Sequence, residues 1–332
     1  MRRTLFLIAS IVVSAFFLWL ALRDIELGAV AQVIAQTNLL GFLLGLALIF
    51  LGLLTRAVRW RGLLGSKIPL SHAFHVLNIG MMLNLIPLRV GEVARSVLVM
   101  RDGVPFVTGA TSIVVERVLD TLLVVVTLAI SLTRVPSAPQ WVTNSAILFG
   151  VLAITAFIIL IALARYPKFA HRLIDEIEKR ITVVQRLRLG HLFGQVIDGL
   201  EPLTHLGRFT HTITWTLISW TLSFTTYYVL ELALGIQQGD LVLGALLSMT
   251  LASLGIAVPL SVAGIGPFQA AIRAAGEMAG FPGVYSASMG LLTHSAAVLV
   301  YAVLGTIGML IMGVSISSIL GEREKINTNE AA

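Results

Sequence analysis

Long apolar runs are the feature that most constrains what this chain can fold into. Six of them lie at residues 4–22, 39–55, 118–133, 145–164, 211–234 and 241–258, each near the roughly 20 residues that cross a bilayer as a helix. Only 12% of the residues are charged, against roughly 25% in soluble domains. We therefore expect an all-α, polytopic integral membrane protein that forms a single membrane domain over residues 1–332.

The apolar stretches at the two ends of the chain leave alternatives open. The first run follows two arginines, as a secretory signal does, but its length favours an uncleaved helix. The last stretch, residues 284–320, is longer than one crossing needs, and Gly305, Gly308 and Gly313 would mark a kink, a close helix contact or a second short segment. The expected total is about seven or eight transmembrane helices.

Two further apolar stretches, residues 72–87 and 259–281, are interrupted by Gly, Pro and polar residues. Such backbone survives at membrane depth only where protein or a water-filled cavity surrounds it, which indicates re-entrant or broken helices. Each break places a Pro and then a Gly after an apolar helix. Corresponding breaks in two halves are typical of inverted-repeat transporters, and the two repeat-like halves here would be residues 39–135 and 211–320.

The distribution of Lys and Arg among the loops predicts the orientation. The loop after the second run holds Arg56, Arg59, Arg61 and Lys67, whereas residues 235–240 hold no basic residue. Residues 165–210 carry eight basic and five acidic residues, and their apolar spacing predicts a basic amphipathic helix on the cytoplasmic surface. We therefore expect a multi-pass protein of the cell (inner) membrane with a cytoplasmic N-terminus. The net charge of +6 is scattered rather than gathered on one face, so nucleic acid is not an expected partner.

The densest group of ionisable and amide side chains lies between residues 84 and 120. It comprises Asn84, Arg89, Glu92, Arg95, Glu116, Arg117 and Asp120. Ionisable groups at membrane depth are costly, and they usually face a cavity or pair with one another. Arginine binds phosphate bidentately, so these residues are predicted to bind an anionic head group. The alternative interpretation is that they are interfacial caps and salt bridges that hold broken helices in place.

A second set of candidates carries a weaker signal. It comprises Arg56, Arg59, Gly264, Gly266, Gln269 and Arg273. The first two equally fit snorkelling anchors at the end of a span, and Arg273 is spaced to pair with Glu277 four residues later. His294 fits a hydrogen bond between helices better than a proton relay.

Enzyme motifs are missing from the sequence. There is no cysteine, no Gly-x-Ser-x-Gly elbow, no P-loop and no His-Glu-x-x-His motif. We therefore predict no enzymatic activity, no cofactor and no metal site.

Three motifs in this order resemble those of a known family, the flippase-like transmembrane domain of lysylphosphatidylglycerol synthases. They are Arg56-x-x-Arg59-Trp60, Asn84-x-x-Pro87-x-Arg89-x-Gly91-Glu92-x-x-Arg95 and Glu116-Arg117-x-x-Asp120, followed by the turn at residues 259–266. The resemblance implies a polytopic helical fold and translocation of a phospholipid or a lipid-linked glycan. Gln269 stands where the family typically has Glu. The aminoacyl transferase domain of the full-length synthases is missing, so synthesis of aminoacyl lipid is not expected.

The predicted function is therefore that of a lipid flippase for an anionic phospholipid or lipid-linked glycan, with membrane lipids as partners. In this prediction Arg89, Arg95 and Arg117 contact phosphate, while Glu92, Glu116 and Asp120 hold them or bind a coupling proton. The alternatives are a small-solute secondary transporter, an intramembrane lipid-modifying enzyme, and a scaffold subunit for a glycosyltransferase or a lipid-synthesising enzyme. A homodimer is also compatible with the sequence.

Overall fold

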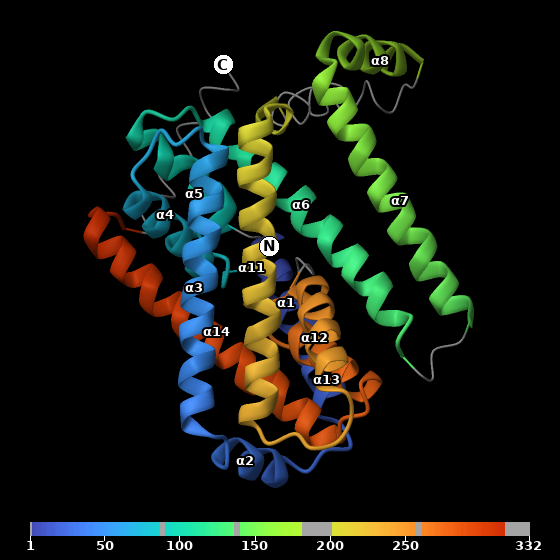
Figure 1. Cartoon of the computed structure of the whole chain (residues 1–332). Coiled ribbons are helices and arrows are strands. Elements are labelled where there is room, and N and C mark those ends of the chain that lie inside the picture. Colours follow the sequence, from blue (N-terminus) through green and yellow to red (C-terminus); the bar gives the residue numbers. More distant parts are fainter. Residues whose placement is uncertain (1, 87–89, 136–139, 181–200, 257–260, 316–332) are drawn as a thin grey trace.

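The computed structural model describes residues 2–86, 90–135, 140–180, 201–256 and 261–315, which form α-helices and two short 3₁₀ turns without any strand (Figure 1). The helices are α1 (Arg2–Leu22), α2 (Leu27–Ala35), α3 (Leu39–Leu63), α4 (Leu70–Leu83), α5 (Val90–Leu98), α6 (Phe106–Leu132), α7 (Gln140–Arg165), α8 (Pro167–Arg180), α11 (Leu206–Ala233), α12 (Leu241–Ile256), α13 (Pro267–Met278) and α14 (Gly283–Met312). The all-α prediction is confirmed for this part of the chain.

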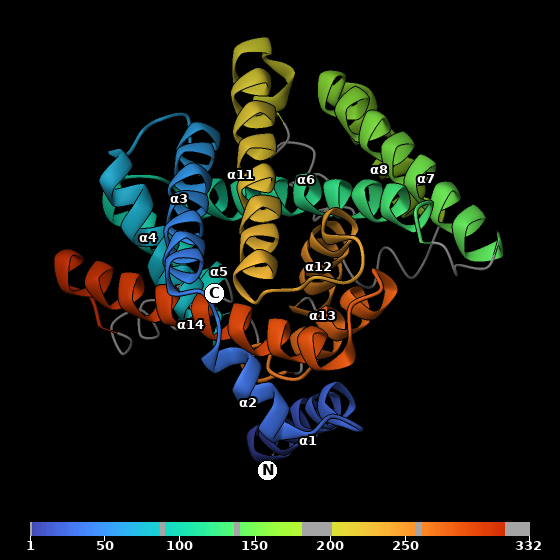
Figure 2. The ribbon, with the colours of Figure 1, turned by 60° about the horizontal axis from the view of Figure 1, so that its bottom comes forward.

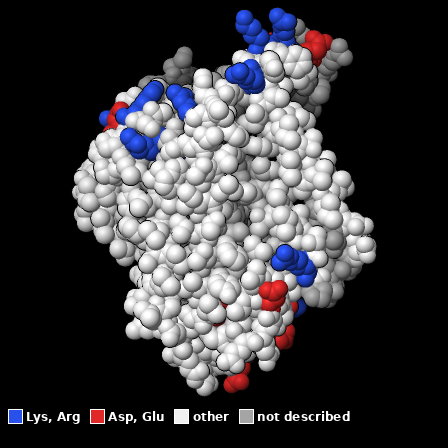
Figure 3. Space-filling view, viewed as in Figure 1, with Lys and Arg blue, Asp and Glu red and all other residues white. Residues whose placement is uncertain are grey.

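The helices that qualify as membrane spans are fewer than expected. By length and composition α3 and α14 are long and apolar enough to cross a bilayer, and α7 with α8 would make a third span if that bent pair is counted as one. The expected count of seven or eight spans is therefore not confirmed. A broad band free of Lys, Arg, Asp and Glu lies between the two charged ends on the face shown in Figure 3, as a protein surrounded by lipid requires.

Helices α3 and α11 form the central antiparallel pair, side by side in Figures 1 and 2. Small residues on α3 allow the close approach. A Cβ atom at Gly41 would lie 2.8 Å from Cβ of Ala233, and one at Gly45 would lie 2.6 Å from Cδ2 of Leu230. Contacts between small residues are the usual way in which helices associate in lipid, where the hydrophobic effect supplies no driving force between them.

The remaining helices pack around this pair. Helix α4 packs on α5 and α14, and α12 packs on α13 and α6. In Figure 1 α4 and α5 lie toward the end of the molecule that carries α8, whereas α12 and α13 lie toward the opposite end, where α2 lies. The predicted stretches 72–87 and 259–281 contain one short helix each, α4 and α13. Helix α5 follows the first stretch and α12 precedes the second. Residues 87–89 and 257–260, where the breaks were expected, lie outside the described residues.

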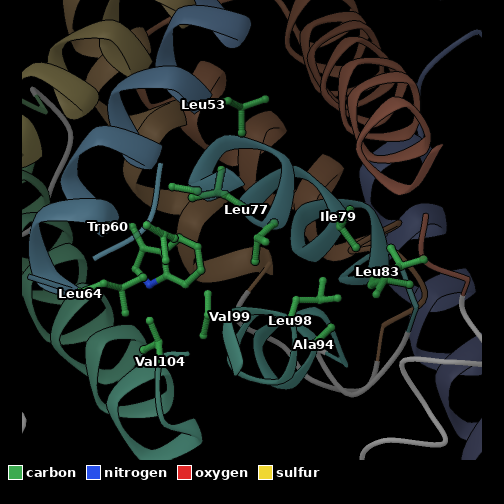
Figure 4. Packing of buried hydrophobic residues seen from close by; sticks show 14 residues of the cluster. Leu53, Trp60, Leu64, Leu77, Ile79, Leu83, Ala94, Leu98, Val99 and Val104 are labelled. Carbon is green, nitrogen blue, oxygen red and sulfur yellow. The ribbon is translucent and has the colours of Figure 1, made fainter. Parts of the chain in front are cut away.

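Helices α4 and α5 cross in very close contact. A Cβ atom at Gly91 would collide with the carbonyl oxygen of Gly80 and would lie 2.7 Å from Oδ1 of Asn84. Beside this crossing lies an apolar core built from α3, α4, α5 and the segment that leads into α6, and it includes the fully buried Trp60 (Figure 4). This core fixes the position of the short helix α5, which is too short to be stable alone.

The C-terminal apolar stretch is one helix through its glycines. Helix α14 runs for 30 residues and ends at Gly313, whose φ of 60° provides a left-handed C-cap. A Cβ at Gly305 would lie 3.0 Å from the carbonyl oxygen of Asn78, and one at Gly308 would lie 3.1 Å from that of His75. Of the three alternatives, namely a kink, a close helix contact or a second short segment, Gly305 and Gly308 therefore make a close contact with α4. Residues 316–320 of the predicted stretch lie outside the described residues.

Helix α8 covers the described part of the predicted amphipathic segment, and residues 181–200 lie outside the described residues. It turns away from α7 at 109° (Figure 1). Its apolar face remains uncovered, with Phe169 62% and Leu173 40% exposed. An exposed apolar face beside Lys168 and Arg172 is typical of a helix that lies in the membrane interface.

Candidate functional site

A cavity of about 350 Å³, the central chamber, is lined by residues of α3 and α11, of α4, α5 and α6, and of α12, α13 and α14. Its wall is mainly apolar, with Leu48, Met81, Met249 and Phe268 among the lining residues. Its polar lining includes Arg56, Asn84, Glu92, Arg117, Asp120, Trp220, Ser223, Thr226, Tyr227, Thr293, His294 and Tyr301. A chamber that combines an apolar wall with a few convergent charged groups is suited to an amphiphilic ligand.

Below this chamber a buried ion-pair network joins α3, α5 and α6. Nη1 of Arg59 lies 2.7 Å from Oδ1 of Asp120, and Nη2 of Arg59 lies 3.3 Å from Oε1 of Glu116. The other oxygen of Glu116 accepts a 2.7 Å hydrogen bond from Nη2 of Arg95. Two arginines and two carboxylates thus neutralise one another. Mutual pairing is what makes such charges tolerable away from water.

Two tryptophans contact the charged groups of this network. The guanidinium of Arg95 lies 4.1 Å from the centroid of the Trp60 ring, a cation–π contact. Trp220 donates a 3.1 Å hydrogen bond from Nε1 to Oδ1 of Asp120. Arg59 and Arg95 are therefore buried structural cations, and neither lines the cavity.

A second cavity of about 400 Å³ adjoins the first, between α6 and α7. Its lining is almost entirely apolar, with Ile113, Val114, Val118, Leu122, Ala153, Ala156, Phe157 and Leu160. The two cavities share three residues, Glu92, Arg117 and Thr121. Nε of Arg117 lies 2.9 Å from Oε1 of Glu92, so a partly exposed ion pair stands where the polar chamber meets the apolar groove.

Arg56 is the remaining cation on the wall of the central chamber. It has no salt-bridge partner within 4.0 Å among the described residues. It shares the wall of the chamber with Asp120, Tyr227 and Tyr301. Because Asp120 is already bound to Arg59, the chamber offers an anion one guanidinium that no carboxylate of the described residues neutralises directly.

The second half of the chain contributes His294 to the wall of the same chamber, and Gln269 binds it from behind. Oε1 of Gln269 accepts a 2.7 Å hydrogen bond from the backbone N–H of Gly266, and the amide nitrogen of Gln269 lies 2.7 Å from Nδ1 of His294. Nε2 of His294 lies 3.0 Å from the carbonyl oxygen of Ala263, which can only accept, so this nitrogen donates. His294 of α14 is therefore hydrogen-bonded to Gln269 of α13 and to the turn before α13, which fits the hydrogen bond between helices that the sequence favours.

The structure brings most of the predicted residues together, at different distances from the chamber. Asn84, Glu92, Arg117, Asp120, Arg56 and Gly264 line it, whereas Arg59, Arg95 and Glu116 lie in the ion-pair network behind it. Arg273 lies elsewhere: it pairs with Glu277 at 2.7 Å and donates to the carbonyl oxygens of Leu20, Ala21 and Arg23 at the end of α1. The phosphate contact predicted for Arg95 is not what its geometry favours, because its side chain is only 4% exposed. Arg89 lies outside the described residues.

One buried carboxyl group is not among the predicted site residues. Glu231 near the end of α11 is fully buried, and both of its oxygens lack a hydrogen-bond partner. Its position inside an apolar run is the only signal the sequence offers. Among the described residues no group of three or more His, Asp or Glu side chains could hold a metal ion.

Comparison with known proteins identifies one family. The family model of the lysylphosphatidylglycerol synthase TM region matches residues 7–305, which is most of the chain. No curated protein and no solved structure matches the chain. The match includes both cavities and the whole ion-pair network, and it links the protein to membrane-lipid metabolism or transport. The chain therefore belongs to the lysylphosphatidylglycerol synthase transmembrane-region family.

Proposed function

We propose that this protein moves an anionic lipid across the cell membrane. The observation that carries the proposal is the junction of the two cavities at Glu92 and Arg117. A lipid has a charged head and apolar chains, and it needs a polar chamber and an apolar groove in direct contact. The α6–α7 groove would hold acyl chains while the head group enters the central chamber. Both phospholipids and lipid-linked glycans have the required phosphate.

Arg56 and Arg117 are the cations suited to the phosphate in this proposal. Arg56 would contribute a guanidinium without a carboxylate partner, and Arg117 would exchange Glu92 for the phosphate when a lipid passes. A planar guanidinium binds phosphate through two parallel hydrogen bonds. Because the Arg117–Glu92 ion pair is partly exposed to solvent, replacing it by a phosphate contact costs little free energy. Arg59, Arg95, Glu116 and Asp120 would serve as the rigid support behind them.

Alternating access around an inverted repeat would move the head group. Several observations support this part of the proposal. The starts of α5 and α6 are 16 residues apart, and so are the starts of α13 and α14. The Glu92–Arg117 ion pair and the Gln269–His294 hydrogen bond each join residues 25 positions apart. In an inverted repeat the two broken helices enter from opposite ends and meet at the transport site.

The first experiment is native mass spectrometry of the protein released gently from its membrane. We expect a co-purifying anionic lipid in the wild type, and loss of that lipid in the Arg56→Gln, Arg117→Gln double variant. Arg208→Gln is the matched control, because Arg208 is exposed at the start of α11 and away from both cavities. Equal lipid binding in all three proteins would show that Arg56 and Arg117 do not bind the lipid phosphate.

A second experiment separates lipid transport from small-solute transport. Ala156→Trp would fill the apolar groove without touching the polar chamber. It should block the exchange of a fluorescent anionic phospholipid between vesicle leaflets, whereas Ile158→Trp on the outer face of α7 should leave that exchange unchanged. A small-solute transporter or a scaffold subunit would tolerate both substitutions equally.

A further inference from the structure

Glu231 is a buried carboxyl group that the proposed lipid path does not use. The residue is completely inaccessible to solvent, and both carboxyl oxygens lack a hydrogen-bond partner. No Lys, Arg or His of the described residues lies within salt-bridge distance of it. The carboxylates of Glu116 and Asp120 are both bound to an arginine. Glu231 has no such partner among the described residues, so a negative charge on it would not be neutralised.

The surroundings of Glu231 leave little room for a counterion. A Cβ atom at Gly244 of α12 would lie 3.1 Å from Oε1 of Glu231 and would collide with the ring of Phe281. The backbone of α12 at Gly244 thus lies close to the carboxyl group and to the Phe281 ring, beside an apolar cluster of α11, α12, α13 and α14. Leaving an isolated carboxylate ionised in such a place costs far more free energy than adding a proton to it.

None of the titratable groups named around Glu231 carries a positive charge. They are Tyr227 on the same helix, Asp240 at the start of α12, and Tyr285 of α14 in the same apolar cluster. Asp240 is a second carboxyl group, and a negative charge on it disfavours a negative charge on Glu231. Nothing among these groups stabilises an ionised Glu231.

Glu231 also lies between the central chamber and the exposed end of the molecule. Tyr227 lines the chamber and lies four residues before Glu231, one helical turn away on the same face. Asp240 is exposed in the loop after α11, where it caps α12 through a 3.0 Å hydrogen bond from the backbone N–H of Leu243. Phe281 is close to both places: a Cβ atom at Gly239 of this loop would lie 2.7 Å from Cδ1 of its ring, and a Cβ atom at Gly244, beside Glu231, would collide with the same ring.

From this arrangement we propose that Glu231 is a proton-binding site that couples proton movement to transport. The carboxyl group carries a proton while α11, α12 and Phe281 enclose it, and it releases the proton when that contact opens. The proton leaves the acid as H⁺ to water and returns the same way, so no further reactant is required. The binding of the proton is independent of the proposed function, whereas the coupling rests on it.

Infrared spectroscopy of the protein in lipid vesicles tests the proton site directly. We expect the carbonyl stretch of a protonated carboxylic acid at neutral pH, shifted in heavy water and lost in Glu231→Gln, which has the size of the neutral acid. Glu277→Gln should keep the band, because Glu277 is a surface carboxylate paired with Arg273. A wild-type spectrum without this band, or the same band in Glu231→Gln, overturns the proposal. Loss of the band upon adding sodium also overturns it, in favour of a sodium site.

Asp240→Asn provides a second test that does not depend on the folding of Glu231→Gln. Removing the repelling negative charge makes the ionised form of Glu231 less unfavourable. The band should therefore disappear at a lower pH in Asp240→Asn than in the wild type. An unchanged titration contradicts the assignment of the band to Glu231.

The coupling has its own readout. An imposed pH gradient should change the rate of fluorescent phospholipid exchange in wild-type vesicles and leave it unchanged in Glu231→Gln. A rate in Glu231→Gln that still follows the gradient overturns the coupling. Absence of lipid exchange from the wild type under all conditions counts against the proposed function, while the infrared band still decides the proton site.

Discussion

At the scale of single residues, the sequence indicated which side chains matter but not how they pair. Asp120 and Glu116 were candidates for a coupling proton, yet both bind arginines, so the proposed proton site is Glu231. Arg59 was as compatible with a snorkelling anchor as with a site residue. Its partner Asp120 is 61 residues away, and helix packing alone brings them together. Periodicity within one helix cannot reveal such a contact.

The ion-pair network predicts a large effect of removing its shared carboxylate. Glu116→Gln would leave Arg59 and Arg95 with only Asp120 to neutralise them, and breaking a buried pair in this way costs about 3–5 kcal/mol. We expect a markedly lower unfolding temperature in detergent, with lipid binding lost through unfolding. Glu277→Gln, which breaks an exposed pair, should change stability by about 0–1 kcal/mol. Similar melting of the two variants would show that the network is not stabilising.

At the scale of helices, apolar runs predicted positions well and lengths poorly. The run at residues 118–133 belongs to α6, which begins at Phe106. Hydropathy missed its first half because Glu116 and Arg117 lie there, and their ion pairs let the helix continue. Conversely, both broken stretches were predicted from Gly and Pro, because these residues change the backbone itself. The contact between Gly80 and Gly91 required the structure.

That contact makes a prediction in which two physical effects oppose each other. Helix propensity alone would make Gly91→Ala stabilising by about 1 kcal/mol. The new methyl group would collide with the carbonyl oxygen of Gly80, and overpacking typically costs about 1–3 kcal/mol, more where backbone must move. We expect Gly91→Ala to lower the unfolding temperature. Gly207→Ala, with no atom within 4 Å of the new Cβ, should keep or raise it. A stabilised Gly91→Ala would contradict the packing of α4 on α5.

At the scale of the whole molecule, the distribution of charge relates the fold to the membrane. The basic side chains visible in Figure 3 concentrate at the end that carries α8, and acidic ones are more frequent at the opposite end. Lys67 is exposed in the loop that follows α3, and Gln237 is exposed in the loop that follows α11. Because α3 and α11 pack antiparallel, with the backbone N–H of Asn38 bound to the carbonyl of Ala233 at 2.8 Å, these loops lie at opposite ends. The positive-inside rule then predicts Lys67 in the cytoplasm and Gln237 outside.

Single cysteines can test this orientation directly, because the natural chain has none. In membrane vesicles of known sidedness, a maleimide that cannot cross the bilayer should label Gln237→Cys from the outer face and Lys67→Cys only from the cytoplasmic face. Both positions are exposed, so labelling measures access rather than unfolding. The reverse pattern would invert the orientation and place the proton site near the cytoplasm. Labelling of both from one face would mean that α3 and α11 do not carry the chain across the bilayer, which would remove the basis for alternating access between the two halves.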